Sequence, residues 1–391
     1  MPKFVKKKFS LSTFQIFLPL SIVLLLIIVN LVNGAGYFSF TLKNGVLYGN
    51  VPSVLFGAAE LVIISIGMAL VTSSSRGQDI SVGVIATITS SVFALVIRQY
   101  LVLYPNGAVS WGIVLLALFI SCLVGVFLGA FNGTLVSVFK VQPMVATLVL
   151  FTAGRSVAFL IDGKVSPILQ YPIIKQIGTA LPGVPVQTPI LITVVCLLLF
   201  AVILKLTNLK LYAQAVGINE EAARLNGINP VAVKLLTFLV LGVCCSIAGF
   251  IAVCKIGRHD SVNILKLIEL DAILAVALGG NALSGGKFSV TGAVIGAYTI
   301  EVLNQTLLRL QVNAEAIKLM KAIFIIILMI LASPVVREYL TKLFSGSAGK
   351  IQIKGPSATA AGGGLRKHEV FEREVSSSGA KSEPAVNKEA Q

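Results

Sequence analysis

Runs of about 20 apolar residues recur along the chain, and this recurrence restricts the fold more than any other feature. A helix needs about 20 residues to cross a hydrocarbon core roughly 30 Å thick, and backbone polar groups in that core must be bonded within the protein. The chain is 56% hydrophobic and 12% charged over 391 residues, which excludes a water-soluble domain. The sequence predicts an all-α polytopic membrane protein. We expect about ten transmembrane helices, at residues 11–32, 51–73, 80–98, 109–131, 141–161, 189–206, 235–254, 267–285, 288–308 and 316–336.

The placement of lysine and arginine predicts the orientation. Four lysines in MPKFVKKKFS precede a first apolar run that is longer than a signal-peptide core. We therefore expect a retained helix, with the N-terminus and, after ten crossings, the C-terminus in the cytoplasm. The basic segment GRHDSVNILK at 257–266 would then lie outside. We interpret the net charge of +15 as a topology signal and not as a nucleic-acid surface.

Composition divides the chain into three parts. Residues 1–10 form a basic cytoplasmic N-terminus, and residues 11–344 form the transmembrane domain, with a polar cytoplasmic segment at 207–234. Residues 345–391 are rich in Gly, Ser, Ala, Lys and Glu, which predicts a disordered tail, either simply solvated or used for docking. The five cysteines all fall in apolar runs and are expected to pack as small hydrophobic residues.

The residue patterns of common catalytic sites are missing from the sequence. His259 and His368 have no companion at metal-ligand spacing, and no GxSxG nucleophile elbow occurs. The stretch GGNALSGGKF at 279–288 resembles a phosphate-binding loop, but that loop would need glycine at Asn281 and serine or threonine at Phe288. We therefore expect no enzyme activity and no metal or cofactor bound by this chain, and we interpret 279–288 as a glycine-rich turn between packed helices.

Two similar segments suggest an internal repeat. GVFLGAFN at 125–132 and GAVIGAYT at 292–299 share the pattern GxxxGA followed by an aromatic residue. A polar-apolar segment with an aspartate, Asp79 or Asp271, lies upstream of each. The predicted topology runs the two GxxxG helices in opposite directions, which predicts an inverted repeat of the kind found in transporters. A single GxxxG often marks only close helix packing.

The polar stretch at 207–229 contains GINEEAARLNGIN, in which two glycines flank a short helix-forming run. Acidic residues near the start of this run and small alanines suit insertion into a groove of a cytoplasmic partner. The alternative is an ordinary surface helix that links two crossings.

Three motifs together resemble those of bacterial ATP-binding-cassette permeases of the ribose type. GQDISVG at 77–83 is similar to the signature G-x-D-(L/I)-S-V-G, and GINEEAARLNGIN is similar to the coupling segment G-x-N-x-x-A-A-x-x-x-G-I. ALGGNALSGGKFSVTGAVIGA at 277–297 is similar to LGG-x-x-L-x-GG-x-G-x-x-x-G-x-x-x-GA. The motifs follow the family's order, and the resemblance covers roughly residues 15–336. Arg76, Gln78 and Phe288 depart from it, which leaves the substrate open.

The resemblance implies a permease subunit in the bacterial inner membrane that moves a monosaccharide or similar small polar solute. Its implied partners are a cytoplasmic ATPase that uses ATP and Mg, a second permease copy or homologue, and a periplasmic or lipid-anchored solute-binding protein. A nucleoside as cargo is an alternative. The resemblance also implies that the ATPase-coupling residues are Gly217, Asn219, Glu220, Glu221, Ala222, Ala223, Arg224 and Gly227.

An ionisable residue at membrane depth costs about 2.5 to 3.5 kcal/mol on insertion scales, so Asp79 should face a partner or a wet cavity. It could hydrogen-bond a polyhydroxylated solute; alternatively, Arg76 neutralises it or it caps the helix that follows. The substrate-path candidates are Gly77, Gln78, Asp79, Ser81, Gly83, Asn132, Asp271, Asn281 and Asn304. An ion-coupled secondary transporter is the other function class, for which the available membrane carboxylates are Glu60, Asp79, Glu269, Asp271 and Glu301.

Overall fold

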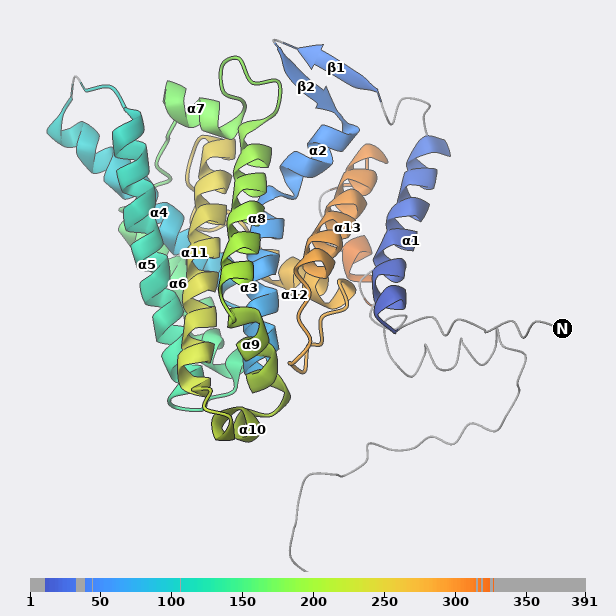
Figure 1. Cartoon of the computed structure of the whole chain (residues 1–391). Coiled ribbons are helices and arrows are strands. Elements are labelled where there is room, and N and C mark those ends of the chain that lie inside the picture. Colours follow the sequence, from blue (N-terminus) through green and yellow to red (C-terminus); the bar gives the residue numbers. More distant parts are fainter. Residues whose placement is uncertain are drawn as a thin grey trace, which may run out of the picture. The chain divides into compact units, whose positions relative to one another are not determined.

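The computed structural model describes residues 11–32, 39–43, 45–105, 107–313, 316–317, 319–323 and 326 (Figure 1). The predicted N-terminus at 1–10, the tail at 345–391 and most of the predicted crossing at 316–336 lie outside the described residues. The three-part division and the cytoplasmic location of both termini therefore stay predictions.

The described chain is helical, as predicted, apart from one short hairpin. The strands β1 (Phe40–Lys43) and β2 (Val46–Gly49) pair antiparallel, with Lys43 opposite Val46. Gly45 adopts a φ of 76° in the turn between them, a conformation that glycine supplies without strain. The hairpin corrects the all-α prediction. The helices are α1 (Leu11–Val32), α2 (Asn50–Gly57), α3 (Ala59–Ser75), α4 (Val82–Leu103), α5 (Trp111–Ser137), α6 (Pro143–Ile161), α7 (Pro172–Gly178), α8 (Thr188–Leu206), α9 (Leu209–Ile218), α10 (Glu220–Leu225), α11 (Pro230–Ile256), α12 (Ile268–Leu278) and α13 (Val290–Arg309).

Fewer helices are long and apolar enough to cross a membrane than the ten predicted. Within the described ranges, α4, α5, α6, α8 and α11 qualify, and α2 with α3 makes a sixth if this pair, bent by 45°, is one span. The predicted crossing at 267–285 is helical only at Ile268–Leu278, because a glycine pair follows and Gly280 takes a φ of 75°. The chain is thus a multi-pass membrane protein, and ten crossings are not confirmed.

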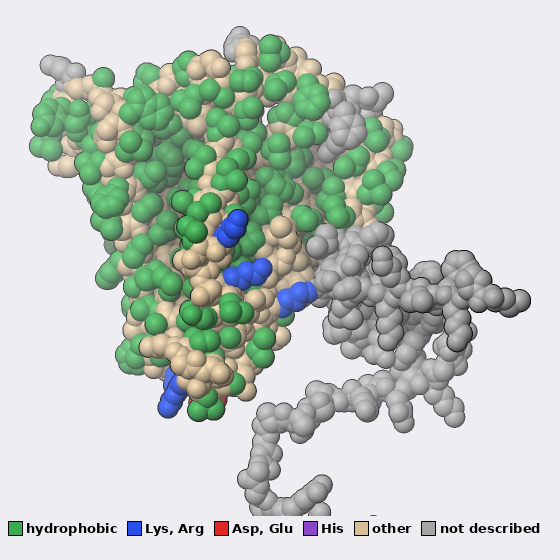
Figure 2. Space-filling view, in the orientation of Figure 1, with side chains coloured by type: hydrophobic (Ala, Val, Ile, Leu, Met, Phe, Trp, Pro, Cys, Tyr) green, Lys and Arg blue, Asp and Glu red, His purple; other side chains and the backbone are tan. Residues whose placement is uncertain are grey.

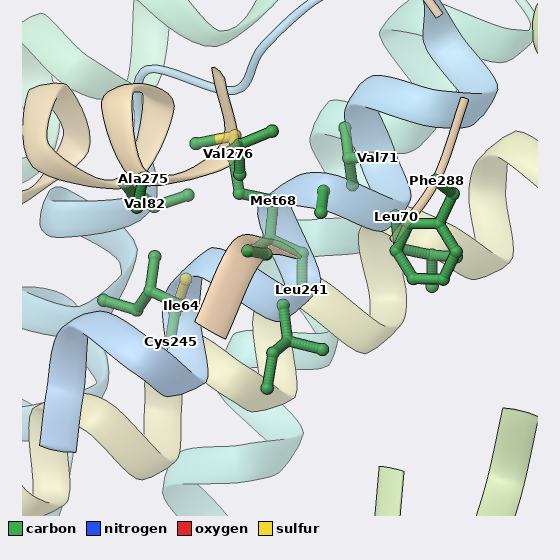
Figure 3. Close-up of a cluster of buried hydrophobic side chains, with 14 of the residues drawn as sticks. Ile64, Met68, Leu70, Val71, Val82, Leu241, Cys245, Ala275, Val276 and Phe288 are labelled. Atoms are coloured by element: carbon green, nitrogen blue, oxygen red, sulfur yellow. The ribbon is translucent and has the colours of Figure 1, made fainter. Parts of the chain in front are cut away.

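Helix α3 forms the centre of the core. Every residue from Ala59 to Ser75 is buried, as expected for a helix that is apolar on all sides. Figure 3 shows Ile64 and Met68 of α3 packed with Leu241 and Cys245 of α11 and with Val276 of α12. The outer helices α5, α6 and α8 instead expose large apolar side chains such as those of Phe119, Val149 and Leu198. Figure 2 shows hydrophobic side chains over most of the visible helical surface.

Both GxxxG segments lie where helices approach closely, but against different partners. On α5, a methyl group at Gly125 would lie 2.5 Å from the carbonyl oxygen of Gly242 on α11. On α13, a methyl group at Gly292 would overlap the backbone of Gly279, just after α12. The helices α5 and α13 run in opposite directions (Figure 1), as the inverted-repeat prediction requires, and the repeat itself stays a prediction.

The helical domain has two distinct ends (Figure 1). One carries the hairpin, α7 and the loop after α11, which are joined by bonds such as Leu47 N to Pro185 O at 2.9 Å and Leu169 N to Gly257 O at 2.8 Å. The other carries α9, α10 and the start of α11. The sequence motifs of interest gather at this second end.

Candidate functional site

A break between α3 and α4 forms the centre of the candidate site. Helix α3 ends at Ser75, where Arg76 takes the left-handed conformation with a φ of 57°, and α4 begins at Val82. Residues with φ above zero are uncommon outside glycine, so the helix stops at a defined residue. The stretch GQDIS therefore crosses the interior without regular secondary structure.

Asp79 lies in this break, fully buried, and its carboxylate is surrounded by donors. Its Oδ1 accepts hydrogen bonds from the backbone N–H and hydroxyl of Ser81, at 2.7 and 2.6 Å. The side-chain amide of Asn132 on α5 donates to Asp79 Oδ2 at 3.3 Å and to the Ser81 hydroxyl at 2.8 Å. The Thr147 hydroxyl of α6 accepts from Ile80 N at 3.2 Å. These bonds join α5 and α6 to the break and meet the requirement that a buried carboxylate be hydrogen-bonded.

Three sequence-predicted residues, Asp79, Ser81 and Asn132, thus come together in one cluster. Ser81 N donates to Asp79 Oδ1 just before α4, but the N-cap residue of α4 is Ser81 and no side chain makes a capping bond there, so the alternative that Asp79 caps this helix is not confirmed. Arg76 does not neutralise Asp79, because the described hydrogen bonds of its guanidinium go elsewhere. The part of Asp79, Ser81 and Asn132 in a substrate path stays a prediction.

Arg76 reaches the C-terminal end of α9 instead. Its Nε donates to Gly217 O at 2.7 Å and its Nη2 donates to Ile218 O at 2.5 Å. Carbonyl groups in the last turn of a helix lack partners within the helix, and cations are favourable there. The break in α3–α4 is therefore joined directly to the predicted coupling segment.

The glycine-rich turn at 279–289 completes the same junction. Gly286 N donates to Ser73 O at 2.9 Å, and Gln78 Nε2 donates to Leu283 O at 3.2 Å. A methyl group at Gly217 would overlap Ser73 O and lie 2.6 Å from Gly286 N. All three motifs of the sequence analysis meet here, and we call this contact of 73–78, 217–218 and 283–286 the three-motif junction.

The remaining path candidates do not join the Asp79 cluster. Asp271 of α12 pairs with Lys321 at 2.8 Å. Asn281 accepts from Ser289 N at 2.6 Å and donates to Val276 O at 3.1 Å, so it shapes the turn before α13. Asn304 donates to Glu301 Oε2 within α13 at 3.2 Å. These contacts hold the three residues within the fold, and their part in a substrate path stays a prediction.

The two glycines of GQDISVG each allow a close approach. A methyl group at Gly77 would lie 2.9 Å from the ring of Pro143 at the start of α6. One at Gly83 would overlap Oε2 of Glu269, a buried atom without a hydrogen-bond partner among the described residues. Both positions thus hold neighbouring helices against the break.

The predicted coupling segment forms α10 and its flanks. Asn219 precedes α10, and its side chain accepts from Ala222 N at 3.0 Å, which is an N-cap. Glu220 pairs with Lys234 of α11 at 2.6 Å, and Ala223 is buried. Gly227 ends the turn with a φ of 81°. These residues hold α10 against α11 at the end of the domain.

The outward side of α10 is exposed in the described part of the chain. Glu221, Ala222 and Arg224 are exposed, and Leu225 is 86% exposed beside them. Ile218, one turn earlier, is 71% exposed. Leu225 and Ile218 were not among the residues predicted for coupling, although an apolar residue inside a polar segment is a usable signal. Exposed apolar side chains rimmed by charges are typical of a protein-binding surface.

Arg155, also missed, lies inside the apolar helix α6. Its guanidinium donates to the carbonyl oxygens of Ser261, Val262 and Ile264 at 3.1 to 3.2 Å. It therefore holds the irregular segment before α12 against α6. A lone arginine in an apolar run was the signal available in the sequence.

His259 forms a hydrogen-bonded chain that sequence spacing could not indicate. Its Nδ1 lies 2.8 Å from Asp162 Oδ2 and its Nε2 lies 3.0 Å from the hydroxyl of Ser90. The order resembles a hydrolase triad, but all three side chains are buried, so the serine is not accessible to a substrate. The hydrogen bonds of His259 connect the segment after α11 to α4 and to the end of α6. No group of three potential metal ligands was found among the residues that the structure describes.

Comparison with known proteins gives a consistent family. The family described as "Branched-chain amino acid transport system / permease component" matches residues 50–333. The chain is 34% identical to a galactofuranose transporter permease protein of Escherichia coli strain K12, over 79% of this chain and 87% of that protein. It is 32% identical to a fructose import permease protein of Bifidobacterium longum, over 82% and 87%. It is 31% identical to a ribose import permease protein of Escherichia coli strain K12, over 78% and 91%. No solved structure matches the chain.

Proposed function

The chain belongs to the family of transport-system permease components, and from this premise we propose that it forms the membrane path of an ATP-binding-cassette importer for a monosaccharide. Similar proteins are named for galactofuranose, fructose and ribose, which supports a sugar as the solute class. Under this proposal the chain breaks no covalent bond, and ATP hydrolysis with Mg belongs to a separate ATPase. The proposed location is the bacterial inner membrane.

The observation that carries the proposal is the exposed surface of α10. This six-residue helix is anchored by an N-cap and by an ion pair to α11, while its outward face, which contains Glu221 and Leu225, is exposed. Such a helix can insert into a groove on another protein. We propose that this end is cytoplasmic and that the ATPase binds here.

The proposed transport cycle needs a second permease and a solute-binding protein outside. Closure of two ATPases on ATP would shift the paired permeases between outward-open and inward-open states. Relatives that are permease components of importers support this assembly. The identity of the second permease is part of the proposal: either another copy of this chain or a homologue.

The test is co-expression with a candidate ATP-binding-cassette ATPase from the same organism. The double variant Glu221→Arg, Ala222→Arg should lose association, because it places two cations on the docking face, whereas wild type should co-purify and stimulate ATP hydrolysis. Val262→Arg is the matched control, since Val262 is 54% exposed and lies on the loop after α11. Unchanged association in the double variant, or ion-dependent uptake without any ATPase, would overturn the proposal in favour of a secondary transporter.

A further inference from the structure

We propose that Arg76 is a positioning residue that transmits movement of α10 to the break between α3 and α4. This inference rests on the proposed function, because it needs an ATPase that moves α10. It goes beyond that function by assigning the connection to one side chain that departs from the family motif.

Arg76 binds its partner at the joint between α9 and α10. Gly217 and Ile218 are the last two residues of α9, and Asn219 is the N-cap of α10. The guanidinium therefore binds the two carbonyls at the joint between these helices. Hydrogen bonds from a charged donor are stronger than neutral ones, and the planar fork of arginine can hold two acceptors at once. A shift of α10 acts on this joint directly.

The backbone between Arg76 and Asp79 has little freedom to move. The Ser75 hydroxyl bonds to Gly77 O at 3.1 Å, and Gly77 packs against the ring of Pro143. Gln78 is bonded to Leu283 O. The backbone from Arg76 to Asp79 is thus confined on several sides, so a displacement of the arginine is passed along it and not absorbed.

The break between α3 and α4 is bonded to two further helices. Asp79 and Ser81 bind Asn132 of α5, and Ile80 binds Thr147 of α6. A displacement of Arg76 would therefore reach the start of α4, Asn132 on α5 and Thr147 on α6. Contiguous packed contacts of this kind can carry coupling between sites, and the claim needs a measurement of coupling.

The experiment uses the complete importer in proteoliposomes, with its ATPase and its solute-binding protein. Arg76→Ala should still co-purify with the ATPase, because the outward face of α10 is unchanged. Stimulation of ATP hydrolysis by the loaded binding protein, and solute moved per ATP, should fall about fivefold or more, the range of ordinary coupling energies. Lys205→Ala, an exposed cation at the end of α8, is the control and should behave as wild type.

Arg76→Lys keeps the charge but cannot hold both carbonyls with one planar fork, so its stimulation should be intermediate. Wild-type coupling in either Arg76 variant would overturn the proposal. Loss of ATPase association in Arg76→Ala would also overturn it, since Arg76 would then act in docking. If Arg76→Ala does not fold, the Arg76→Lys result decides. If wild type itself shows no ATPase association, the proposed function has failed, which is a separate outcome.

Discussion

The side-chain amide of Asn132 donates to the carboxylate of Asp79 at 3.3 Å, although 53 residues separate them in the sequence. The same amide also holds the hydroxyl of Ser81. One asparagine on α5 thus completes the bonding of a fully buried acid in the break between α3 and α4. Several measurable consequences follow from this cluster and from its neighbours.

Replacing Asn132 by alanine should destabilise the protein by about 1 to 3 kcal/mol, the usual cost of leaving buried polar groups without a partner. Thermal denaturation of the purified protein in detergent would measure the loss. Thr134→Ala is the matched control on the same helix, because the Thr134 hydroxyl donates to Ala130 O in its own helix and to no other group among the described residues. Equal stability of both variants would contradict the role given to Asn132.

Replacing Lys255 by methionine should be strongly destabilising. Its ammonium lies 2.8 Å from Glu60, and both side chains are nearly buried. It also donates to Phe56 O at 2.7 Å and lies over the Phe56 ring. Removing one partner of such a pair costs about 3 to 5 kcal/mol, whereas removing both costs much less. The double variant Glu60→Gln, Lys255→Met should therefore unfold at a higher temperature than Lys255→Met, and a lower one would refute this account.

Gly217→Ala should loosen the three-motif junction, because the added methyl group would overlap backbone atoms of Ser73 and Gly286. Forcing atoms into a packed site typically costs about 1 to 3 kcal/mol. Unfolding in detergent measures the effect, with Gly112→Ala as control, since its nearest neighbour would be Ser110 Oγ at 3.8 Å. Equal tolerance at both glycines would show that the junction is not tightly packed.

Asn219→Ala should fray α10 by removing its N-cap, a loss of about 0.5 to 2 kcal/mol in helix stability. Hydrogen exchange of the amides at 222–225 would report the fraying as faster exchange. Asn219→Asp keeps an acceptor at the cap and should retain protection. Slow exchange in Asn219→Ala would mean that contacts with α11, such as Glu220 with Lys234, hold α10 without the cap.

The loop after α11 should lose stability in acid. The Asn263 side-chain amide donates to Asp260 at 2.9 Å and, as the largest cause, lowers the pKa of that carboxyl below its ordinary value of 3.8. A lowered native pKa contributes stability that is complete above the ordinary value and is lost as the pH falls through the native one. The protection factors of the loop amides, which are exchange rates corrected for the intrinsic effect of pH, should therefore fall once the pH falls below 3.8. Asp260→Asn should lack this pH dependence, and an identical profile in both proteins would exclude Asp260 as its source.

The outer helices were predictable from apolar length alone, and the interior was not. The predicted crossings at 141–161 and 189–206 match α6 and α8 closely, because a helix surrounded by lipid is defined by its own composition. The prediction for 267–285 failed because the glycines after Leu278 end the helix within an apolar stretch. Asp79 and Asn132 could each be selected as polar residues at membrane depth, but their contact depends on how α5 packs.

The partners of Arg76 and His259 could not be predicted from the sequence either, because these contacts also depend on how the helices pack. One alternative paired Arg76 with Asp79, its neighbour in sequence, yet Arg76 binds carbonyls 141 and 142 residues away. His259 was judged by sequence spacing, whereas its contacts are with residues of α4 and the end of α6. The three motifs were recognised separately, and only the structure showed that they form one junction.

The three-motif junction also sets an order of events during synthesis. Gln78 is 205 residues ahead of its partner Leu283, and Ser73 is similarly far ahead of Gly286, whose N–H donates to its carbonyl oxygen. Helix α3 is therefore made and inserted long before the groups that hold its end have left the ribosome. Until then the break near Asp79 is bonded to α5, to α6 and, through Arg76, to the end of α9. A truncated or stalled chain that stops before residue 283 should leave this end of the membrane domain unfinished, where quality-control proteases can recognise it.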